Sequence, residues 1–222
     1  MLTAATDRRF KLAMPVYACG YYDEIGRYTK FYGRRSECDA RAVARWDELF
    51  DSKHYAAQMD LPVFWFASSN DAAFPFDLLQ RTLRLPRQRP SLAIRVRMVH
   101  SHGPAGENMP ELFMFADNVL NGAPPLPVVG VPELSNGELW VRFDAKGRKL
   151  KRVDLNWCKA EPPLVDSRWE TAQFPVPDDD VFRAKVPEGA TRAYVNFVLD
   201  CQTGEERYPE ALVSSRAVVI GK

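Results

Sequence analysis

Histidine and cysteine, the side chains that most often bind transition metals, are scarce in this sequence. The 222 residues include three histidines and four cysteines, which are Cys19, Cys38, Cys158 and Cys201. The cysteines are far apart and form no Cys-x-x-Cys pair, so neither a zinc cage nor a thiol redox motif is indicated. We therefore expect buried free thiols, and the sequence predicts no metal centre and no cofactor.

An excess of charge of one sign is also missing. Lysine and arginine total 30 against 29 aspartate and glutamate residues, which leaves a net charge of +1. This balance predicts no broad basic surface for nucleic acid. No segment approaches the roughly 20 apolar residues of a membrane-spanning helix, and the first 20 residues lack the basic and apolar regions of a signal peptide. A composition that is 46% hydrophobic is typical of a soluble globular protein with a sizeable core.

Three apolar runs in the first half of the chain predict β-strands. They span residues 11–19, 62–67 and 91–99 and are rich in Val, Ile, Phe and Trp. The middle run does not alternate between apolar and polar residues, as expected for a central strand of a parallel sheet with helices on both faces. Helical patterns lie between and after these runs. Strand and helix therefore alternate three times, which predicts an open three-layer α/β sheet.

Two of the helices have recognisable ends in the sequence. Ser36 and Asp39 have the spacing of a capping box, and apolar residues then recur at helical spacing over residues 43–50. Another helix is predicted to begin at Pro110, which suits a first turn, and to stop at Gly122.

The second half of the chain has a different pattern. Proline and glycine predominate in residues 123–132, which are predicted to form a linker. Short alternating segments then follow at roughly ten-residue spacing, separated by turn signals such as Ser-Asn-Gly and Pro-Glu-Gly. We therefore expect an α/β portion over residues 1–122 and a small antiparallel β-sandwich over residues 133–222, similar to immunoglobulin or fibronectin type III modules.

Polar residues that could carry chemistry follow two of the predicted strands. Asp71 comes just after the second apolar run, and His100 and His102 follow the third. The carboxyl ends of neighbouring parallel strands meet at one edge of a sheet, so these side chains can come together. An acid after one strand and a histidine after the next is how α/β-hydrolases complete their Ser, Asp, His order. The acid would fix the imidazole tautomer, and the imidazole would take the proton of the nucleophile.

Other interpretations of these residues stay open. A loop aspartate such as Asp71 often forms a turn or caps a helix. A His-x-His pair at a strand end can bind a metal, although no further ligand cluster lies nearby in the sequence. Ser68 and Ser69 precede Asp71 without the glycines of a nucleophile elbow, and His54 is interpreted as structural.

Residues 7–20, 45–86 and 94–127 resemble the carboxyl half of an α/β-hydrolase of the acetyl xylan esterase and prolyl oligopeptidase-like group. Its strongest elements are Asn-Asp after the second run and the His-x-His-Gly turn after the third. The resemblance implies that Asp71 is the triad acid and His102, directly before Gly103, the triad base, with His100 as the alternative. The flexible His-Gly turn favours His102, whereas His100 could still lie in the strand.

The chain departs from this family at the nucleophile, because it contains no Gly-x-Ser-x-Gly. The resemblance implies that the elbow lies upstream of Met1. We therefore expect a serine hydrolase fragment with little or no turnover alone, whose partners are a small ester, glycan or peptide substrate and the missing amino-terminal half of the domain. Bacterial members of the group with a trailing sandwich suggest an exported enzyme.

Two further functions stay open. A peptidase of the prolyl oligopeptidase-like group would use the same acid and base as an esterase. Alternatively, the chain is a non-catalytic binding or accessory protein whose β-sandwich recognises carbohydrate or protein. Trp140, Trp157 and Trp169 could then stack on sugars, although tryptophan in a sandwich core is the commoner arrangement.

Overall fold

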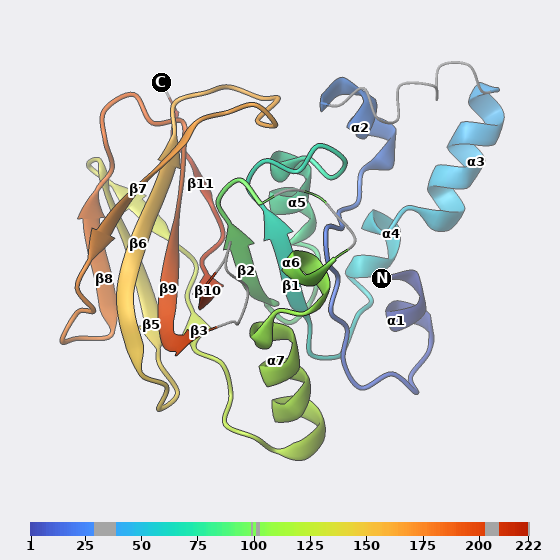
Figure 1. Ribbon diagram of the computed structural model, residues 1–222. Coiled ribbons are helices and arrows are strands. Elements are labelled where there is room, and N and C mark those ends of the chain that lie inside the picture. Colours follow the sequence, from blue (N-terminus) through green and yellow to red (C-terminus); the bar gives the residue numbers. More distant parts are fainter. Residues whose placement is uncertain (29–38, 99, 101–102, 203–208, 222) are drawn as a thin grey trace.

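The computed structural model describes residues 1–28, 39–98, 100, 103–202 and 209–221, and it has a mixed α/β architecture (Figure 1). Helices and two parallel strands make up the first half: α1 (Leu2–Thr6), α2 (Tyr22–Tyr28), α3 (Ala40–Phe50), α4 (Lys53–Ala56), β1 (Phe64–Ser68), α5 (Phe76–Thr82), β2 (Ser91–Arg95), α6 (Pro104–Glu107) and α7 (Pro110–Asn121). The second half is built from strands: β3 (Val128–Val129), β4 (Glu133–Ser135), β5 (Glu138–Asp144), β6 (Leu150–Cys158), β7 (Trp169–Phe174), β8 (Val181–Lys185), β9 (Arg192–Gln202), β10 (Glu210–Ser214) and β11 (Val218–Val219).

The two strands of the first half pair in parallel. All five residues of β1 are buried, as predicted for a strand covered on both faces. The preceding segment lies beside β1 through isolated parallel bridges, at Ala13 with Val63 and Val16 with Phe66. The run predicted as a strand over residues 11–19 is therefore broken into bridges. Pro15 lies between them and has no N–H to donate to a ladder, although its carbonyl accepts a hydrogen bond from Phe66.

The helix and strand ends predicted from the sequence agree only in part with those of the structure. Asp39 is the N-cap of α3, and its carboxylate accepts a hydrogen bond from the Arg41 N–H at 3.2 Å; Ser36 lies outside the described residues. Helix α7 begins at Pro110, and Gly122 caps its carboxyl end with a left-handed φ of 71°; both predictions are confirmed. The third apolar run forms a strand only as far as Arg95, because the chain turns there through a positive φ at Arg97.

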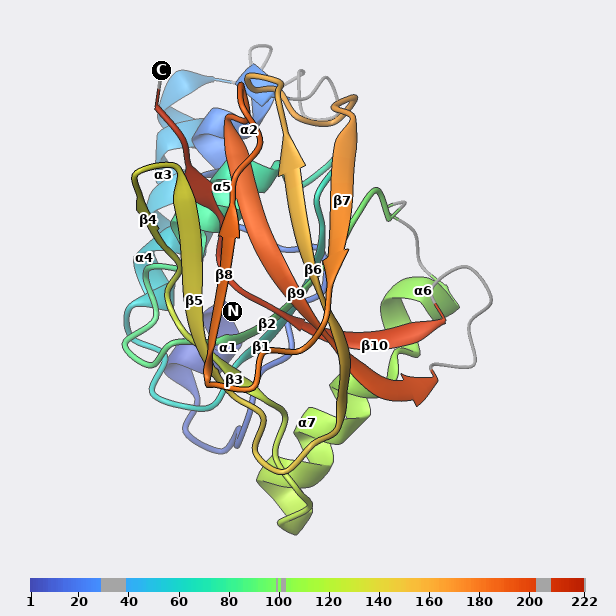
Figure 2. The ribbon, with the colours of Figure 1, turned by 90° about the vertical axis from the view of Figure 1, so that its left-hand side faces the viewer.

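The second half forms two antiparallel sheets that face each other (Figure 2). One has the strand order β10-β9-β6-β7 with β11 also on β9, and the other has the order β3-β5-β4 with β8 also on β5. Phe143 of β5 lies 4.6 Å from Phe197 of β9, measured between ring centroids. Strand β5 alternates between buried and exposed residues, as its sequence predicted. The short strand β3 lies within the predicted linker and pairs with β5.

The two halves pack directly against each other, with β10 beside the outer edge of β2 (Figure 1). The backbone N–H and carbonyl groups of β2 at this edge form hydrogen bonds mainly with side chains of the antiparallel half. The Ile94 N–H donates to the Ser214 hydroxyl at 2.7 Å, and the Ile94 carbonyl accepts from the Asn196 amide at 3.2 Å. Trp169 of β7 packs against Phe76 of α5, with ring centroids 5.1 Å apart. The halves are thus joined by an interface as well as by the chain, and the domain boundaries given above stay a prediction.

A buried ion pair lies in this interface. Arg95 of β2 contacts Glu111 of α7, and their side chains are 5% and 0% exposed. The same glutamate oxygen accepts the Leu212 N–H of β10 at 2.9 Å, and Arg95 also donates to the Glu210 carbonyl at 2.9 Å. Residues of β2, α7 and β10 therefore contribute to this pair, although the second glutamate oxygen, Oε2, has no hydrogen-bond partner among the described residues.

Two expectations drawn from the composition concern the cysteines and membranes. Cys19 and Cys158 are buried and Cys201 is partly exposed, and all three are free thiols; Cys38 lies outside the described residues. Among the helices that the structure describes, none is long and apolar enough to cross a bilayer.

Candidate functional site

Asp71 and His100 meet at the carboxyl edge of the parallel strands. Asp71 lies in the loop after β1, and His100 follows the turn after β2. His100 Nδ1 is 3.0 Å from both Oδ1 and Oδ2 of Asp71. The Asp71 side chain is 2% exposed and that of His100 is 24% exposed. A buried carboxylate therefore orients a partly exposed imidazole.

The Asp71 carboxylate is itself held by the backbone of its own loop. Its Oδ1 accepts hydrogen bonds from the Ala73 N–H at 2.7 Å and the Phe74 N–H at 2.8 Å. These bonds close a turn directly before α5, which is the ordinary structural role of a loop aspartate. They also fix the direction of the carboxylate, so the turn-forming interpretation and the orienting interpretation hold for the same residue.

Two aromatic rings pack against the imidazole of His100. The Tyr17 ring centroid lies 4.6 Å away and that of Phe74 lies 5.6 Å away. Tyr17 is buried and has a φ of 50°, which is rare for a bulky residue and common near functional sites. A Cβ on Gly106 of α6 would lie 2.6 Å from the Tyr17 ring, so a larger residue there would displace the ring. The sequence analysis did not identify Tyr17 as a site residue, because a positive φ cannot be predicted from the pattern of apolar residues.

The geometry selects one tautomer of the imidazole. Nδ1 faces a carboxylate, which only accepts hydrogen bonds, so Nδ1 carries the proton and the lone pair is on Nε2. An imidazole in this state, backed by a carboxylate, can take a proton from a hydroxyl group. The arrangement therefore supplies the acid and the base of a proton-transfer system.

Among the described residues, the nucleophilic side chains near this pair are engaged in other contacts or fully buried. The Ser69 hydroxyl donates to Asn70 Oδ1 at 2.7 Å and accepts the Arg97 N–H at 3.0 Å, and Ser68 is fully buried. Cys19 is also fully buried. Burial, followed by the charges of Asp71 and Asp51, raises the pKa of the Cys19 thiol, so the reactive thiolate is not formed at neutral pH.

The structure describes two of the three predicted site residues. It brings Asp71 together with His100, the alternative base. His102, the preferred base, lies outside the described residues, so its role and the His-x-His metal pair both stay predictions. Since β2 ends at Arg95, His100 lies beyond the strand, and its position does not disfavour it as the base. His54 is elsewhere, with Nε2 3.2 Å from Asp47.

Within the described residues, one group of carboxylates is close enough together to hold a cation. Oxygens of Asp23, Asp47 and Asp51 lie within 4.8 Å of one another. The Lys53 ammonium lies 2.7, 3.0 and 3.7 Å from these three carboxylates, respectively. Asp51 also accepts the Tyr22 N–H at 2.6 Å at the start of α2. The lysine and the helix start account for this cluster without a metal.

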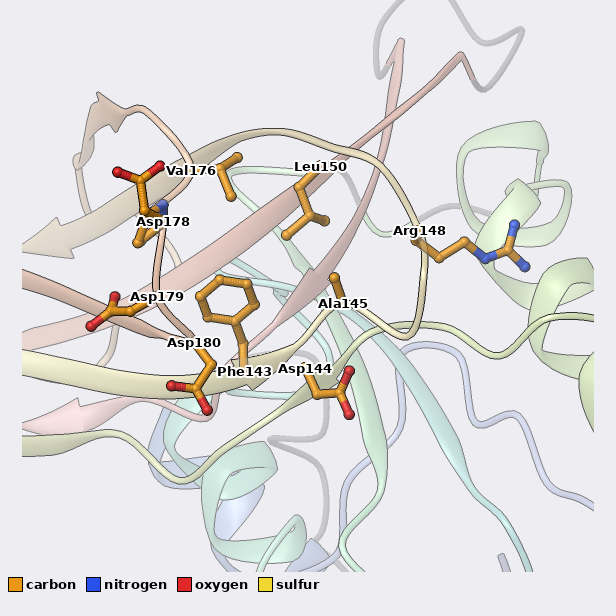
Figure 3. A pocket seen from close by; sticks show the side chains of 10 residues that line it. Phe143, Asp144, Ala145, Arg148, Leu150, Val176, Asp178, Asp179 and Asp180 are labelled. Carbon is orange, nitrogen blue, oxygen red and sulfur yellow. The ribbon is translucent and has the colours of Figure 1, made fainter.

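The antiparallel half has a pocket of about 430 Å³ near one end (Figure 3). Its lining is partly apolar and partly acidic: Phe143, Asp144, Ala145, Arg148, Leu150, Val176, Pro177, Asp178, Asp179 and Asp180. None of the three tryptophans considered for sugar stacking lines it. Trp157 and Trp169 are 8% and 6% exposed and belong to the core, whereas Trp140 is partly exposed.

Fold and site together describe a mixed α/β protein with a carboxylate–imidazole pair at the edge of a parallel sheet. Neither a family model nor a curated protein matches the chain. Among solved structures, it is similar to a carbohydrate acetylesterase from Xanthomonas citri, with 17% identity and a TM-score of 0.33. The similarity covers 72% of this chain and 42% of that chain, so this chain spans less than half of that structure.

Proposed function

We propose that this chain is the acid–base part of a serine hydrolase for ester or acyl cleavage. In this proposal, residues 1–122 are a partial α/β-hydrolase domain and residues 133–222 are an immunoglobulin- or fibronectin-like sandwich. One observation carries the proposal: His100 Nδ1 lies 3.0 Å from both oxygens of a buried Asp71 at the carboxyl edge of parallel strands. The sequence resemblance to the acetyl xylan esterase group supports it.

Each residue of the pair has a defined part in this reaction. Asp71 holds the imidazole and stabilises its protonated form, and His100 removes the proton of a serine as the serine attacks the acyl carbonyl. His100 then returns that proton to the leaving alcohol. It next activates the water that hydrolyses the acyl-enzyme, receives the water proton and returns it to the serine. We assign the base to His100, the alternative in the sequence prediction, because its ring nitrogen has the required contact with Asp71.

The nucleophile of this reaction comes from outside these 222 residues, since they contain no Gly-x-Ser-x-Gly. The sheet has an edge suited to such a partner. Ala13 and Val16 form bridges to one side, with β1, and no described strand pairs with the other side of this segment. An unpaired edge accepts another strand. The proposed partner is therefore a hydrolase segment that carries the elbow and adds to this edge.

The test is to co-express this chain with the product of the coding sequence upstream of Met1 and to measure hydrolysis of p-nitrophenyl acetate. We expect turnover only when both are present. Replacing the base, as in His100→Gln, should lower kcat by at least about 10⁴-fold, and Asp71→Asn should lower it by about 10⁴-fold, as in a serine protease triad. His102→Gln is the matched control and should keep most of the activity.

Three results would contradict the proposal. If no Gly-x-Ser-x-Gly is encoded upstream in any frame or in an adjacent gene, the catalytic assignment fails. If His102→Gln abolishes activity while His100→Gln does not, the base is His102. If the chain alone hydrolyses the ester at a rate that survives both histidine substitutions, neither histidine is the base. A parallel assay with a prolyl peptide substrate distinguishes peptidase from esterase activity.

A further inference from the structure

The side chain of Asn70, directly before Asp71, binds a loop of the antiparallel half. Its Nδ2 donates to the carbonyls of Leu164 and Val165, each at 3.0 Å, and of Ser167 at 2.8 Å. These residues lie between β6 and β7 and form a turn closed by a 3.0 Å hydrogen bond from the Ser167 N–H to the Leu164 carbonyl. The turn thus surrounds one amide group with three acceptors.

The other end of the same amide is linked to the turn that leads to His100. Asn70 Oδ1 accepts the Ser69 hydroxyl at 2.7 Å, and that hydroxyl accepts the Arg97 N–H at 3.0 Å. The Ser69 N–H in turn donates to the Arg95 carbonyl at 3.1 Å. Hydrogen bonds therefore connect the loop of Asp71, the turn before His100 and the β6–β7 turn at a single point.

We propose that Asn70 is a positioning residue through which the antiparallel half holds the Asp71–His100 pair in its productive geometry. This inference rests on the proposed function of that pair. Asn70 precedes Asp71 in the chain, so movement of its amide moves the carboxylate. Misplacement of a catalytic group by about 1 Å can lower a rate by about 100-fold.

The chemistry of the site requires an amide at position 70. The three carbonyls only accept hydrogen bonds, so their partner must be a donor, whereas the Ser69 hydroxyl needs an acceptor. Asparagine supplies both from one short side chain. An aspartate of the same shape would place a carboxylate against three carbonyl oxygens. The β6–β7 turn is therefore part of the active-site scaffold, which distinguishes the antiparallel half from a detachable binding module.

The experiment follows the proton on His100 Nδ1 by NMR of the full chain labelled with nitrogen-15 histidine. The signal is assigned by its absence from His100→Gln. In Asn70→Ala and Asn70→Asp, solvent exchange of this proton should be about fivefold faster, the factor that one net hydrogen bond represents. Ser69→Ala leaves the three carbonyl contacts intact and removes the hydrogen bonds that the hydroxyl forms with Asn70 Oδ1 and the Arg97 N–H. This variant should increase the exchange rate of the His100 proton less than the Asn70 substitutions do. It serves as the second variant if Asn70→Asp does not fold.

The matched control is Asn118→Ala. Asn118 also donates from Nδ2 to a carbonyl, that of Ala123 at 2.6 Å, but it lies at the end of α7. Its loss should lower the free energy of unfolding without changing exchange at His100. The positioning role is overturned if Asn70→Ala leaves exchange within twofold of wild type, or if Asn118→Ala increases it equally. If the unsubstituted chain lacks a protected Nδ1 proton on His100, the pair itself is absent and the proposed function fails first.

Discussion

Asp71 combines two roles that often belong to different residues. Its Oδ1 closes the turn before α5, and both of its oxygens face His100. Because the turn bonds come from rigid backbone, they hold the carboxylate in place without help from the imidazole. Tyr17 also supports the pair, because its ring packs against His100 and lies close to the backbone at Gly106. At the scale of single residues, the site is thus fixed by one turn and one strained tyrosine.

Replacing Gly106 tests this support. In Gly106→Ala the new Cβ would lie 2.6 Å from the Tyr17 ring, so the ring, which packs against His100, would have to shift. Overpacking of this kind typically costs about 1–3 kcal/mol of unfolding free energy, which urea denaturation measures. Gly26→Ala is the control, because nothing lies within 4 Å of its added methyl group and alanine favours the helix. Equal or greater stability of Gly106→Ala would show that the ring has free space.

At the scale of elements, β10 is held in the sheet in two ways: it pairs with β9, and its charged side chain Glu210 contacts β6. Glu210, the first residue of β10, contacts Arg152, and Lys151 Nζ lies 2.6 Å from its carboxylate. The hydrogen bond from Arg152 is the main cause that lowers the pKa of the Glu210 carboxyl to about 2. This carboxyl therefore stays ionised in the folded protein at pH values where an unfolded glutamate is protonated.

The lowered pKa predicts how stability depends on pH. A carboxyl with a lowered folded pKa stabilises the fold fully above its unfolded pKa, about 4.3, and loses this contribution as the pH falls toward about 2. We expect Glu210→Gln to be less stable than wild type at pH 7 and the difference to vanish near pH 2. Chemical denaturation at several pH values measures this, with the exposed Glu138→Gln as control. A difference that is constant with pH would rule out the charge as its cause.

At the scale of the whole molecule, the two halves share one interface instead of being connected only through the predicted linker. It is crossed by the hydrogen bonds of Arg95 and Glu111 with β10, by the Ser214 and Asn196 contacts with β2, and by the hydrogen bonds of the Asn70 amide. One buried hydrophobic cluster also contains residues of both halves, among them Phe64 and Phe197, so separating the halves would expose apolar surface to water. We expect the halves to unfold together.

Substitution of Glu111 tests this expectation. Glu111→Ala removes the buried carboxylate that contacts the Arg95 guanidinium, and breaking a buried ion pair in this way typically costs about 3–5 kcal/mol. The double variant Arg95→Met/Glu111→Leu should recover most of that loss, since apolar residues of similar volume often replace a buried ion pair without penalty. Circular dichroism and tryptophan fluorescence during urea unfolding should give one coincident transition in each variant. Two separate transitions would show that the halves are independent domains.

Local patterns explain why much of the fold could be predicted. The buried strand β1, the start of α7 at Pro110, its stop at Gly122 and the strands from β5 to β9 follow from apolar periodicity and turn residues, which act within a few neighbours along the chain. The interruption of the first strand at Pro15 is also a local effect, and the sequence contained that signal.

The sequence by itself determined which polar residues follow the parallel strands, and therefore that Asp71 and a histidine of the His-x-His turn could meet. Only the tertiary structure decided that His100 contacts Asp71, because the choice depends on where β2 ends and how the chain turns at Arg97. The contacts of Tyr17 and Asn70 were likewise decided in three dimensions. Their partners lie 83 to 97 residues away along the chain, a separation that no local propensity can encode.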